Sequence, residues 1–300
     1  MVDYLVTRTN GVYVDCTVGG GGHARAILLN APAGRLVGLD LDESALEEAD
    51  RTLESFGGRY ELVHGNFANL GAHLADRGLG EVDGVLFDLG FSSLQLDNAA
   101  RGLSYSQDGP IDMRFDQGSG ESAGTLISHV SEHELAGILL QFGEERRSHP
   151  IARSIIEARE AGRLSTTSDL ARAVEATKPA RRNKTLSRVF QALRIAVNGE
   201  LVNLTEGLRS AVEILRPGGR LVVISYHSLE DRLTKRYFVK CEDPCTCPRE
   251  LPQCVCGAVP TLRIITKRVV RPGAAEVAKN SRSRSAKLRA AERLAPGEAP

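Results

Sequence analysis

Short, continuous apolar runs alternate with helix-length segments in the first third of the sequence, and a further run lies near residue 220. Runs without polar alternation are typical of strands that are covered on both faces of a sheet. Strands of this kind separated by helical segments form parallel sheets, because a parallel pair needs a crossover connection. The sequence therefore predicts an α/β fold, with strands in YVDCTV (13–18), RLVGLDLD (35–42), YELVHGNF (60–67), VDGVLFDLG (82–90) and RLVVIS (220–225).

The alternation stops between residues 107 and 197, where the pattern is helical almost throughout. Ser131 and Glu134 have the spacing of a capping box, Gly162 is expected to end a helix, and Thr167 or Ser168 is expected to cap the next one. About 90 residues are too many for a single crossover, which favours an inserted domain.

The predicted organisation is therefore a discontinuous sheet domain, 1–106 with 198–270, and a helical domain, 107–197, inserted into it. The remaining residues, 271–300, are rich in Ala, Arg, Ser and Lys, and are expected to form a basic, flexible tail.

Charge and hydropathy limit the possible partners. The net charge is zero, but residues 178–194 carry six basic side chains and no acid, and residues 261–300 carry ten Lys or Arg against three Glu. Both stretches could meet a phosphate backbone, and the alternative is a solvated helix face and a disordered tail. No apolar run approaches the roughly 18 residues of a membrane span, and the first residues do not form a signal peptide. We therefore expect a cytoplasmic protein with no membrane partner.

The first strand runs into four consecutive glycines, VDCTVGGGGH (14–23). Such a loop between a strand and a helix lets a ligand approach the backbone. Asp40 ends the next strand, about twenty residues further on, where a carboxylate can accept hydrogen bonds from both hydroxyls of a ribose. NAD and S-adenosylmethionine both fit this pairing, and a tight structural turn is the alternative. The strict G-x-G-x-x-G pattern is absent, since residue 24 is Ala.

Longer motifs between residue 11 and about residue 270 resemble the RsmH (MraW) family of bacterial methyltransferases. FDLGFSSLQLD, DMRFD and SYHSLEDR are far more specific than any nucleotide-site pattern. The other matching stretches are GVYVDCTVGGGGHARAIL, GLDLDESAL, GNFANL, RGLSY, GEERRSHPIARSI, FQALRIAVNGEL, LRPGGRLVVIS and KCEDPCTCPRELPQCVCG. Family members usually carry a His-Pro-Val-Leu type segment before the first strand and a Pro-Ala pair before FQALRI, and this sequence has MVDYLVTRTNG and RRNKTLSRV at those places.

The resemblance implies a class I S-adenosylmethionine-dependent methyltransferase (Rossmann-like) sheet, with the inserted all-helical domain recognising RNA or the target base. It implies methyl transfer from S-adenosyl-L-methionine to the N4 amine of one cytidine, C1402, in 16S ribosomal RNA. The small ribosomal subunit would be the partner, and the enzyme would be a monomer or a homodimer.

The resemblance also implies which residues bind the cofactor. Gly21, Gly22 and His23 would line its amino-acid end, and His23 could donate to its carboxylate. Asp40 would hold the ribose and Phe67 would pack near the adenine, with Asp88 and Gln95 completing the pocket.

Methyl transfer from a sulfonium is an in-line displacement, so the enzyme chiefly has to position the amine. A cytosine amine is a poor nucleophile, and an acceptor for its N–H groups can localise the lone pair and take the proton. The candidate acceptors are Asp88, Asp112 and the pair Asn198/Glu200, and the sequence does not rank them. His227 and Ser228, which follow the last predicted strand, could contact RNA or support the site.

Two other functions remain open. An NAD-dependent oxidoreductase shares the glycine loop and Asp40, but does not explain DLGFSSLQLD or the LRPGGRLVV hairpin. A non-catalytic RNA-binding assembly factor on a methyltransferase fold is the second, and the intact glycine loop and DLGFSS speak against it.

Five of the six cysteines lie between Cys241 and Cys256, and the sixth, Cys16, is expected to be a small buried space-filler. The five could hold zinc, form a disulfide, or remain free thiols. Their C-x-C pairs differ from the usual zinc spacing of two to four intervening residues. We therefore assign no metal to the catalytic site from the sequence.

Overall fold

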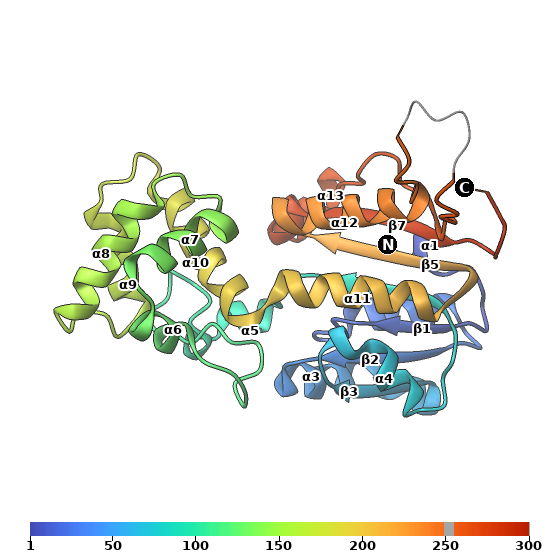
Figure 1. Ribbon diagram of the computed structural model, residues 1–300. Helices are drawn as coiled ribbons and strands as arrows, with labels where there is room; N and C mark the ends of the chain where they lie inside the picture. The colour runs from blue at the N-terminus through green and yellow to red at the C-terminus, as the bar shows by residue number, and fades with distance from the viewer. Residues whose placement is uncertain (249–254, 300) are drawn as a thin grey trace. The chain divides into compact units, whose positions relative to one another are not determined.

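The computed structural model describes residues 1–248 and 255–299 (Figure 1). They form two compact units, Met1–Gly90 with Leu201–Pro300, and Phe91–Glu200. The second unit thus begins earlier, and ends slightly later, than the inserted domain predicted at 107–197.

The first unit is built on a seven-stranded sheet of order β3-β2-β1-β4-β5-β7-β6. Strands β1 to β5 are parallel, and β7 is antiparallel to both of its neighbours. The α/β class predicted from the apolar runs is confirmed. The strands are β1 (Val12–Asp15), β2 (Arg35–Asp40), β3 (Tyr60–His64), β4 (Val82–Asp88), β5 (Leu215–Ser225), β6 (Leu262–Ile264) and β7 (Lys287–Arg293).

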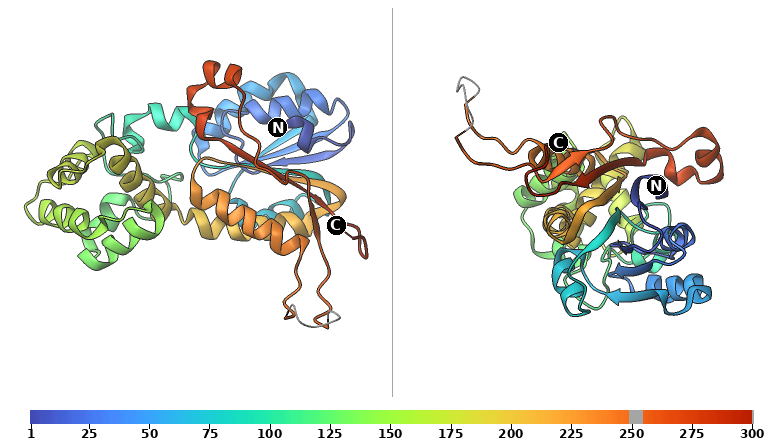
Figure 2. Two further views of the ribbon diagram at one scale, coloured as in Figure 1. Left: turned by 90° about the horizontal axis from the view of Figure 1, so that it is seen from above. Right: turned by 90° about the vertical axis from the view of Figure 1, so that its right-hand side faces the viewer.

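Helices cover both faces of this sheet (Figures 1 and 2). One face packs against α4 (Leu70–Ala75), α11 (Glu200–Ile214) and α12 (Ser228–Glu242). The other packs against α1 (Val2–Leu5), α2 (Gly22–Asn30) and α3 (Glu43–Leu53). Because both faces are buried, the strands carry the continuous apolar runs that the sequence shows.

The Pro-Gly-Gly part of LRPGGRLVV forms a bulge inside β5. Leu215 pairs with Val82 and Arg220 pairs with Gly84, so residues 216–219 stand opposite Asp83 alone. Gly218 takes a left-handed conformation (φ +78°) that favours glycine. After the bulge, β5 continues beside β4 in the buried middle of the sheet.

The expectation of a flexible tail over 271–300 is wrong. This segment contains α13 (Ala274–Lys279) and β7, which fills the place between β5 and β6. Ala290 and Ala291 of β7 are fully buried. Two of its basic side chains, Lys287 and Arg289, form ion pairs with Asp231 at 3.0 and 2.7 Å, so part of the positive charge is neutralised within the unit.

The second unit is helical around one apolar core. Its helices are α5 (Ser93–Asp97), α6 (Ala123–His129), α7 (Glu132–Gly143), α8 (Ser148–Glu160), α9 (Thr167–Ala176) and α10 (Arg182–Asn198). Ser131 caps α7 in a capping box with Glu134, as predicted. Gly162 (φ +66°) follows the end of α8, also as predicted. The predicted cap of α9 is wrong, because Thr166 accepts the Asp169 N–H in place of Thr167 or Ser168.

Among the described residues, no helix combines the length and the apolarity that crossing a membrane would require.

Candidate active site

Three carboxylates end three adjacent parallel strands of the first unit. Asp15 ends β1, Asp40 ends β2 and Asp88 ends β4. The chain runs outward from β1 to β3 on one side and from β4 to β5 on the other, so the strand order reverses between β1 and β4. In open α/β sheets, ligands bind at the carboxyl edge at such a point.

The glycine loop lies between β1 and α2 and is tied to the end of β2. The Gly19 N–H donates to Asp40 Oδ2 at 2.8 Å, and Asp40 Oδ1 accepts from the Asp42 N–H at 3.0 Å. Gly21 has φ +82°, and a Cβ there would lie 3.1 Å from the Ala49 backbone of α3. A Cβ at Gly22 would meet nothing within 4 Å. Gly21 therefore serves the turn and its packing, whereas Gly22 leaves the start of α2 open.

Asp15 is a functional candidate that the sequence analysis missed. Its side chain is fully buried, Oδ1 accepts from the Thr17 N–H at 3.2 Å, and Oδ2 has no hydrogen-bond partner. Burial raises the pKa of Asp15 to about 7, against the lowering effects of His23 and of the Thr17 N–H. A buried carboxylate oxygen without a partner is costly, which marks this place as one prepared for a polar ligand. The signal in the sequence was an acid directly before the glycine loop.

His23 and Asp88, both predicted site residues, contact each other. His23 Nε2 lies 3.2 Å from Asp88 Oδ2, and the Tyr226 hydroxyl donates to Asp88 Oδ1 at 3.1 Å. The Asp88 N–H donates to Thr17 Oγ1 at 2.7 Å, which fixes the end of β4 against the glycine loop. Burial lowers the pKa of His23, but the hydrogen bond and the charge of Asp88, followed by the charge of Asp15, outweigh it and raise the pKa. Tyr226 was missed, although it directly follows the end of β5.

The three carboxylates at the strand ends influence one another. Burial raises the pKa of Asp15 most, and the charges of Asp88 and Asp40 add to the rise. Burial also raises the pKa of Asp40. Carboxylate oxygens accept hydrogen bonds, so this group of acceptors fits the ammonium group and the ribose hydroxyls of S-adenosylmethionine.

Phe67 lies just beyond β3, at the start of a short 3-10 helix, Phe67–Asn69. Its ring meets the ring of Phe87 edge to face, with centroids 5.3 Å apart. Gly207 of α11 packs against both rings, and a Cβ there would lie 2.8 Å from Phe67 and 3.1 Å from Phe87. Phe67 is thus held in place while its side chain remains only partly buried.

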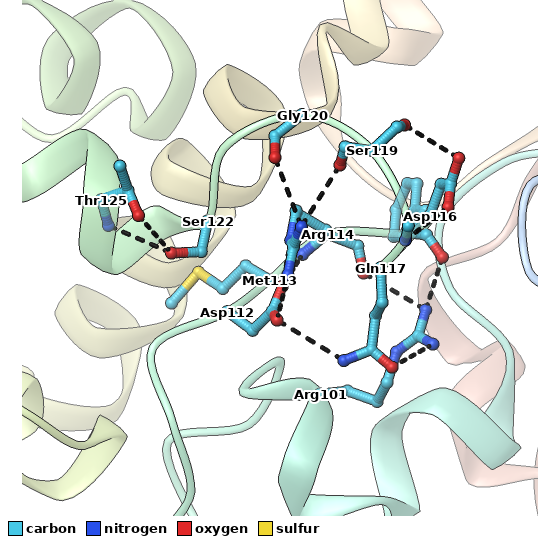
Figure 3. A network of polar contacts seen from close by, with 12 residues as sticks. Arg101, Asp112, Met113, Arg114, Asp116, Gln117, Ser119, Gly120, Ser122 and Thr125 are labelled. Atoms are coloured by element: carbon cyan, nitrogen blue, oxygen red, sulfur yellow. Dashed lines mark hydrogen bonds and ion pairs between the residues drawn. The ribbon is translucent and has the colours of Figure 1, made fainter.

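Two further predicted residues lie in the helical unit. Gln95 is largely buried and belongs to the capping box of α5, where its Oε1 accepts the Ser92 N–H at 2.8 Å. Asp112 is held by Arg114, whose Nε and Nη2 lie 2.8 and 2.9 Å from its two oxygens (Figure 3). Burial opposes ionisation of Asp112, but the Arg114 contacts prevail and lower its pKa. Asp112 is therefore a weak base.

The other two acceptor candidates already have partners, and Asn198 fastens the loop around Asp112. The Asn198 side chain accepts the Phe115 N–H at 2.7 Å and donates to the Met113 carbonyl at 2.8 Å. Glu200 forms a buried, two-pronged pair with Arg194 at 2.7 and 2.9 Å. Both side chains therefore have structural partners. Met113 adopts φ +63°, so its backbone is strained and is held by these contacts.

The environments of the remaining predicted residues differ from one another. His227 caps α12 in a capping box with Glu230, and Cys16 is buried with a raised pKa, as expected of a space-filler. In the basic stretch, Arg182 pairs with Glu175 and Arg188 with Glu145.

Known proteins resemble the chain along nearly its whole length. It is 49% identical over 296 residues to "Ribosomal RNA small subunit methyltransferase H" of Carboxydothermus hydrogenoformans, covering 98% of this chain and 95% of that protein. It is 50% identical over 299 residues to the protein of the same name from Geobacter sulfurreducens, covering 98% and 96%. A Streptococcus mutans methyltransferase structure in complex with SAH has a TM-score of 0.44 at 13% identity, covering 98% of this chain and 95% of that one.

The sequence pattern of the MraW methylase family matches residues 1–294. The resemblance expected from FDLGFSSLQLD and SYHSLEDR is confirmed, as is a class I methyltransferase sheet. The chain is a methyltransferase and belongs to the MraW methylase family.

Proposed function

We propose that the protein transfers a methyl group from S-adenosyl-L-methionine to the N4 amine of one cytidine in 16S ribosomal RNA. Relatives about half identical over nearly the whole chain are named as small-subunit ribosomal RNA methyltransferases. The position within the RNA corresponds, in this proposal, to C1402.

The observation that carries the proposal is the group formed by His23, Asp88 and Tyr226. It joins the helix after the glycine loop to the carboxyl ends of β4 and β5. A methyl donor bound against the glycine loop would therefore lie beside a carboxylate that can accept a hydrogen bond from an amine.

S-adenosylmethionine, when bound, would supply an electrophilic methyl group carried on a sulfonium, with a neutral thioether as the leaving group. Asp88 accepts a hydrogen bond from one N–H of the cytosine amine, which concentrates the lone pair on N4. Asp88 would take the proton that N4 loses on methylation and pass it to water. Asp88 is the preferred acceptor because it ends β4 beside the glycine loop, whereas the contacts with Arg114 lower the pKa of Asp112 and make it a weaker base.

The cofactor-binding roles follow the same geometry. Asp40 would accept the ribose hydroxyls with the lone pairs that the two N–H donors leave open. Phe67 would pack against the adenine, while Gly21, Gly22 and His23 would surround the amino-acid end. Gln95 as a pocket residue remains a prediction.

RNA binding is assigned to the basic stretch of the helical unit. Among the described residues, no ion pair involves Lys178, Arg181 or Lys184, so these cations are available to phosphates. The substrate is 16S RNA, free or within the small subunit.

The test is incubation of the purified protein with methyl-labelled S-adenosylmethionine and small subunits that lack the modification. Digestion to nucleosides and mass spectrometry should show N4-methylcytidine at a single position. Free 16S RNA, assembled subunits and NAD in place of the methyl donor serve as the parallel arms. Label at a ring carbon, at another nucleotide, or in no RNA form would contradict the proposal.

A further inference from the structure

Three cysteine side chains meet in the loop between α12 and β6. Cys245 and Cys247 lie shortly after α12, and Cys256 lies before β6. Their three Sγ atoms all lie within 4.8 Å of one another. Figure 2 shows the two arms of this loop, drawn in orange, leaving the unit together. Of the other cysteines in the sequence cluster, Cys241 is not a member of the group, and Cys254 lies outside the described residues.

The sulfur geometry matches a shared metal ion. Cys256 Sγ lies 3.9 Å from Cys245 Sγ. A tetrahedral zinc with Zn–S bonds of about 2.3 Å has its sulfurs about 3.8 Å apart. A disulfide between these two sulfurs would instead need a separation of about 2.05 Å.

A backbone hydrogen bond links the two arms of the loop beside the sulfur group. The Val255 N–H, on the arm before β6, donates to Cys247 Sγ, on the arm after α12, at 3.4 Å.

The described residues of the loop form no apolar core around the thiols. Within 243–248 and 255–260 no residue is buried, and the side chains of Val255 and Val259 are 78% and 57% exposed. A backbone hydrogen bond from the Thr261 N–H to the Cys241 carbonyl, at 2.8 Å, closes its base. Ordering such a segment costs conformational entropy that apolar packing does not offset here. Small segments of this kind are typically held by a metal or a disulfide.

We propose that Cys245, Cys247 and Cys256 bind a structural zinc ion that joins the two arms of this loop. Soft thiolates select zinc over calcium or magnesium, and zinc adds no redox chemistry. The site clamps the connection between α12 and β6, separate from the carboxylates at the ends of β1, β2 and β4. The one-residue spacing of Cys245 and Cys247 brings the two sulfurs to one side of a single loop arm.

The first measurement is metal content by mass spectrometry of tag-free full-length protein, prepared without chelator in zinc-containing medium. We expect about one zinc per chain. Cys245→Ser, Cys247→Ser and Cys256→Ser should each reduce it severalfold. Cys241→Ser is the matched control, because it lies four residues from Cys245 and outside the sulfur group, and it should retain the metal.

A second measurement guards against variants that lose metal only because they misfold. Replacing zinc with cobalt should produce thiolate-to-cobalt charge-transfer absorption and the intense visible bands of a tetrahedral ion. Both should weaken in Cys247→Ser while its far-UV circular dichroism matches that of the wild type. Metal-free wild-type protein with all thiols reactive, a disulfide between these cysteines, or full metal content in all three variants would overturn the proposal.

Discussion

His23 Nε2 lies 3.2 Å from Asp88 Oδ2, so the helix that follows the glycine loop is joined to the end of β4 by a charged contact. The side chains are 40% and 22% exposed, which leaves room for a ligand to reach both. A change at either residue is therefore expected to alter the cofactor end and the acceptor end of the site together.

Asp88→Asn should abolish most of the activity. The substitution keeps the size of the side chain but removes the base, and general-base catalysis is worth about 10²–10⁴-fold in rate. Single-turnover methylation of small subunits measures the effect, with calorimetry reporting S-adenosylmethionine affinity separately. Tyr226→Phe is the matched control: it removes one hydrogen bond to Asp88 and should slow the reaction only about tenfold. Wild-type turnover in Asp88→Asn would exclude Asp88 as the acceptor.

The pKa of His23 should depend on Asp88. In the wild type it lies above 6.5, because Asp88 and Asp15 together outweigh burial. In Asp88→Asn burial prevails, so the pKa should fall. NMR titration of the His23 Cε1–H resonance gives both values. Asp15→Asn should lower the pKa less, because its influence is smaller than that of Asp88. Equal values in the wild type and Asp88→Asn would show that the contact is absent in solution.

Asp15 should make the apoprotein less stable as the pH rises. Its pKa is 3.8 when unfolded and about 7 when folded, so between these values the folded state binds the proton and the unfolded state does not. Stability linked to this group is therefore fully present below about pH 4 and is lost as the pH rises through about 7, amounting to on the order of 4 kcal/mol. The urea concentration at the midpoint of unfolding, measured from pH 5 to pH 8, should fall more steeply with rising pH for the wild type than for Asp15→Asn. Parallel curves would contradict the assignment.

Gly207→Ala should weaken cofactor binding. The added methyl group would lie 2.8 Å from Phe67, so that ring must move from its place beside Phe87. The expected result is a several-fold higher Kd for S-adenosylmethionine. Gly137→Ala in α7 is the control, because its Cβ meets nothing within 4 Å, and it should stabilise the helix by up to about 1 kcal/mol with Kd unchanged. An unchanged Kd in Gly207→Ala would show that Phe67 does not pack against the adenine.

Arg181→Gln should reduce the salt dependence of RNA binding. Each lost phosphate contact lowers the slope of log K against log salt by about 0.7–0.9. Arg182→Gln should change the slope less, because Arg182 already pairs with Glu175 at 2.5 Å. Filter binding at salt concentrations from about 50 to about 300 mM measures the slope of log K against log salt for each variant. Identical slopes in the wild type and Arg181→Gln would remove this stretch from the RNA interface.

The central sheet was predictable because its strands are buried on both faces and are therefore continuously apolar. β7 was not, because KLRAAER has the composition of a helix or a tail. Its extended conformation depends on pairing with β5 and on Asp231 accepting Lys287 and Arg289, which are partners distant in sequence. The cap of α9 lies at Thr166, earlier than predicted, because Thr166 and Ser168 are nearly equivalent as N-cap residues in the sequence.

The candidate site was predictable where position along a strand determines the role. Asp40 and Asp88 end apolar runs, so the carboxyl edge of a parallel sheet brings them near the glycine loop. The contact of His23 with Asp88, the donor Tyr226 and the unpartnered oxygen of Asp15 depend on side-chain packing, which no spacing rule specifies. Asp112 shows the opposite case: its motif predicted a candidate base, and Arg114, two residues away, holds it as an ion pair.

The position of β7 in the sheet has a consequence for how the chain folds during synthesis. Among the described strands β6 pairs only with β7, and β7 is the last of the seven to be translated. Until residues 287–293 leave the ribosome, β5 presents an open edge and β6 has no neighbour. Exposed edges of this kind promote association between nascent chains. A premature stop before residue 287 should therefore yield insoluble protein rather than a shortened enzyme, even though every proposed site residue would already have been made.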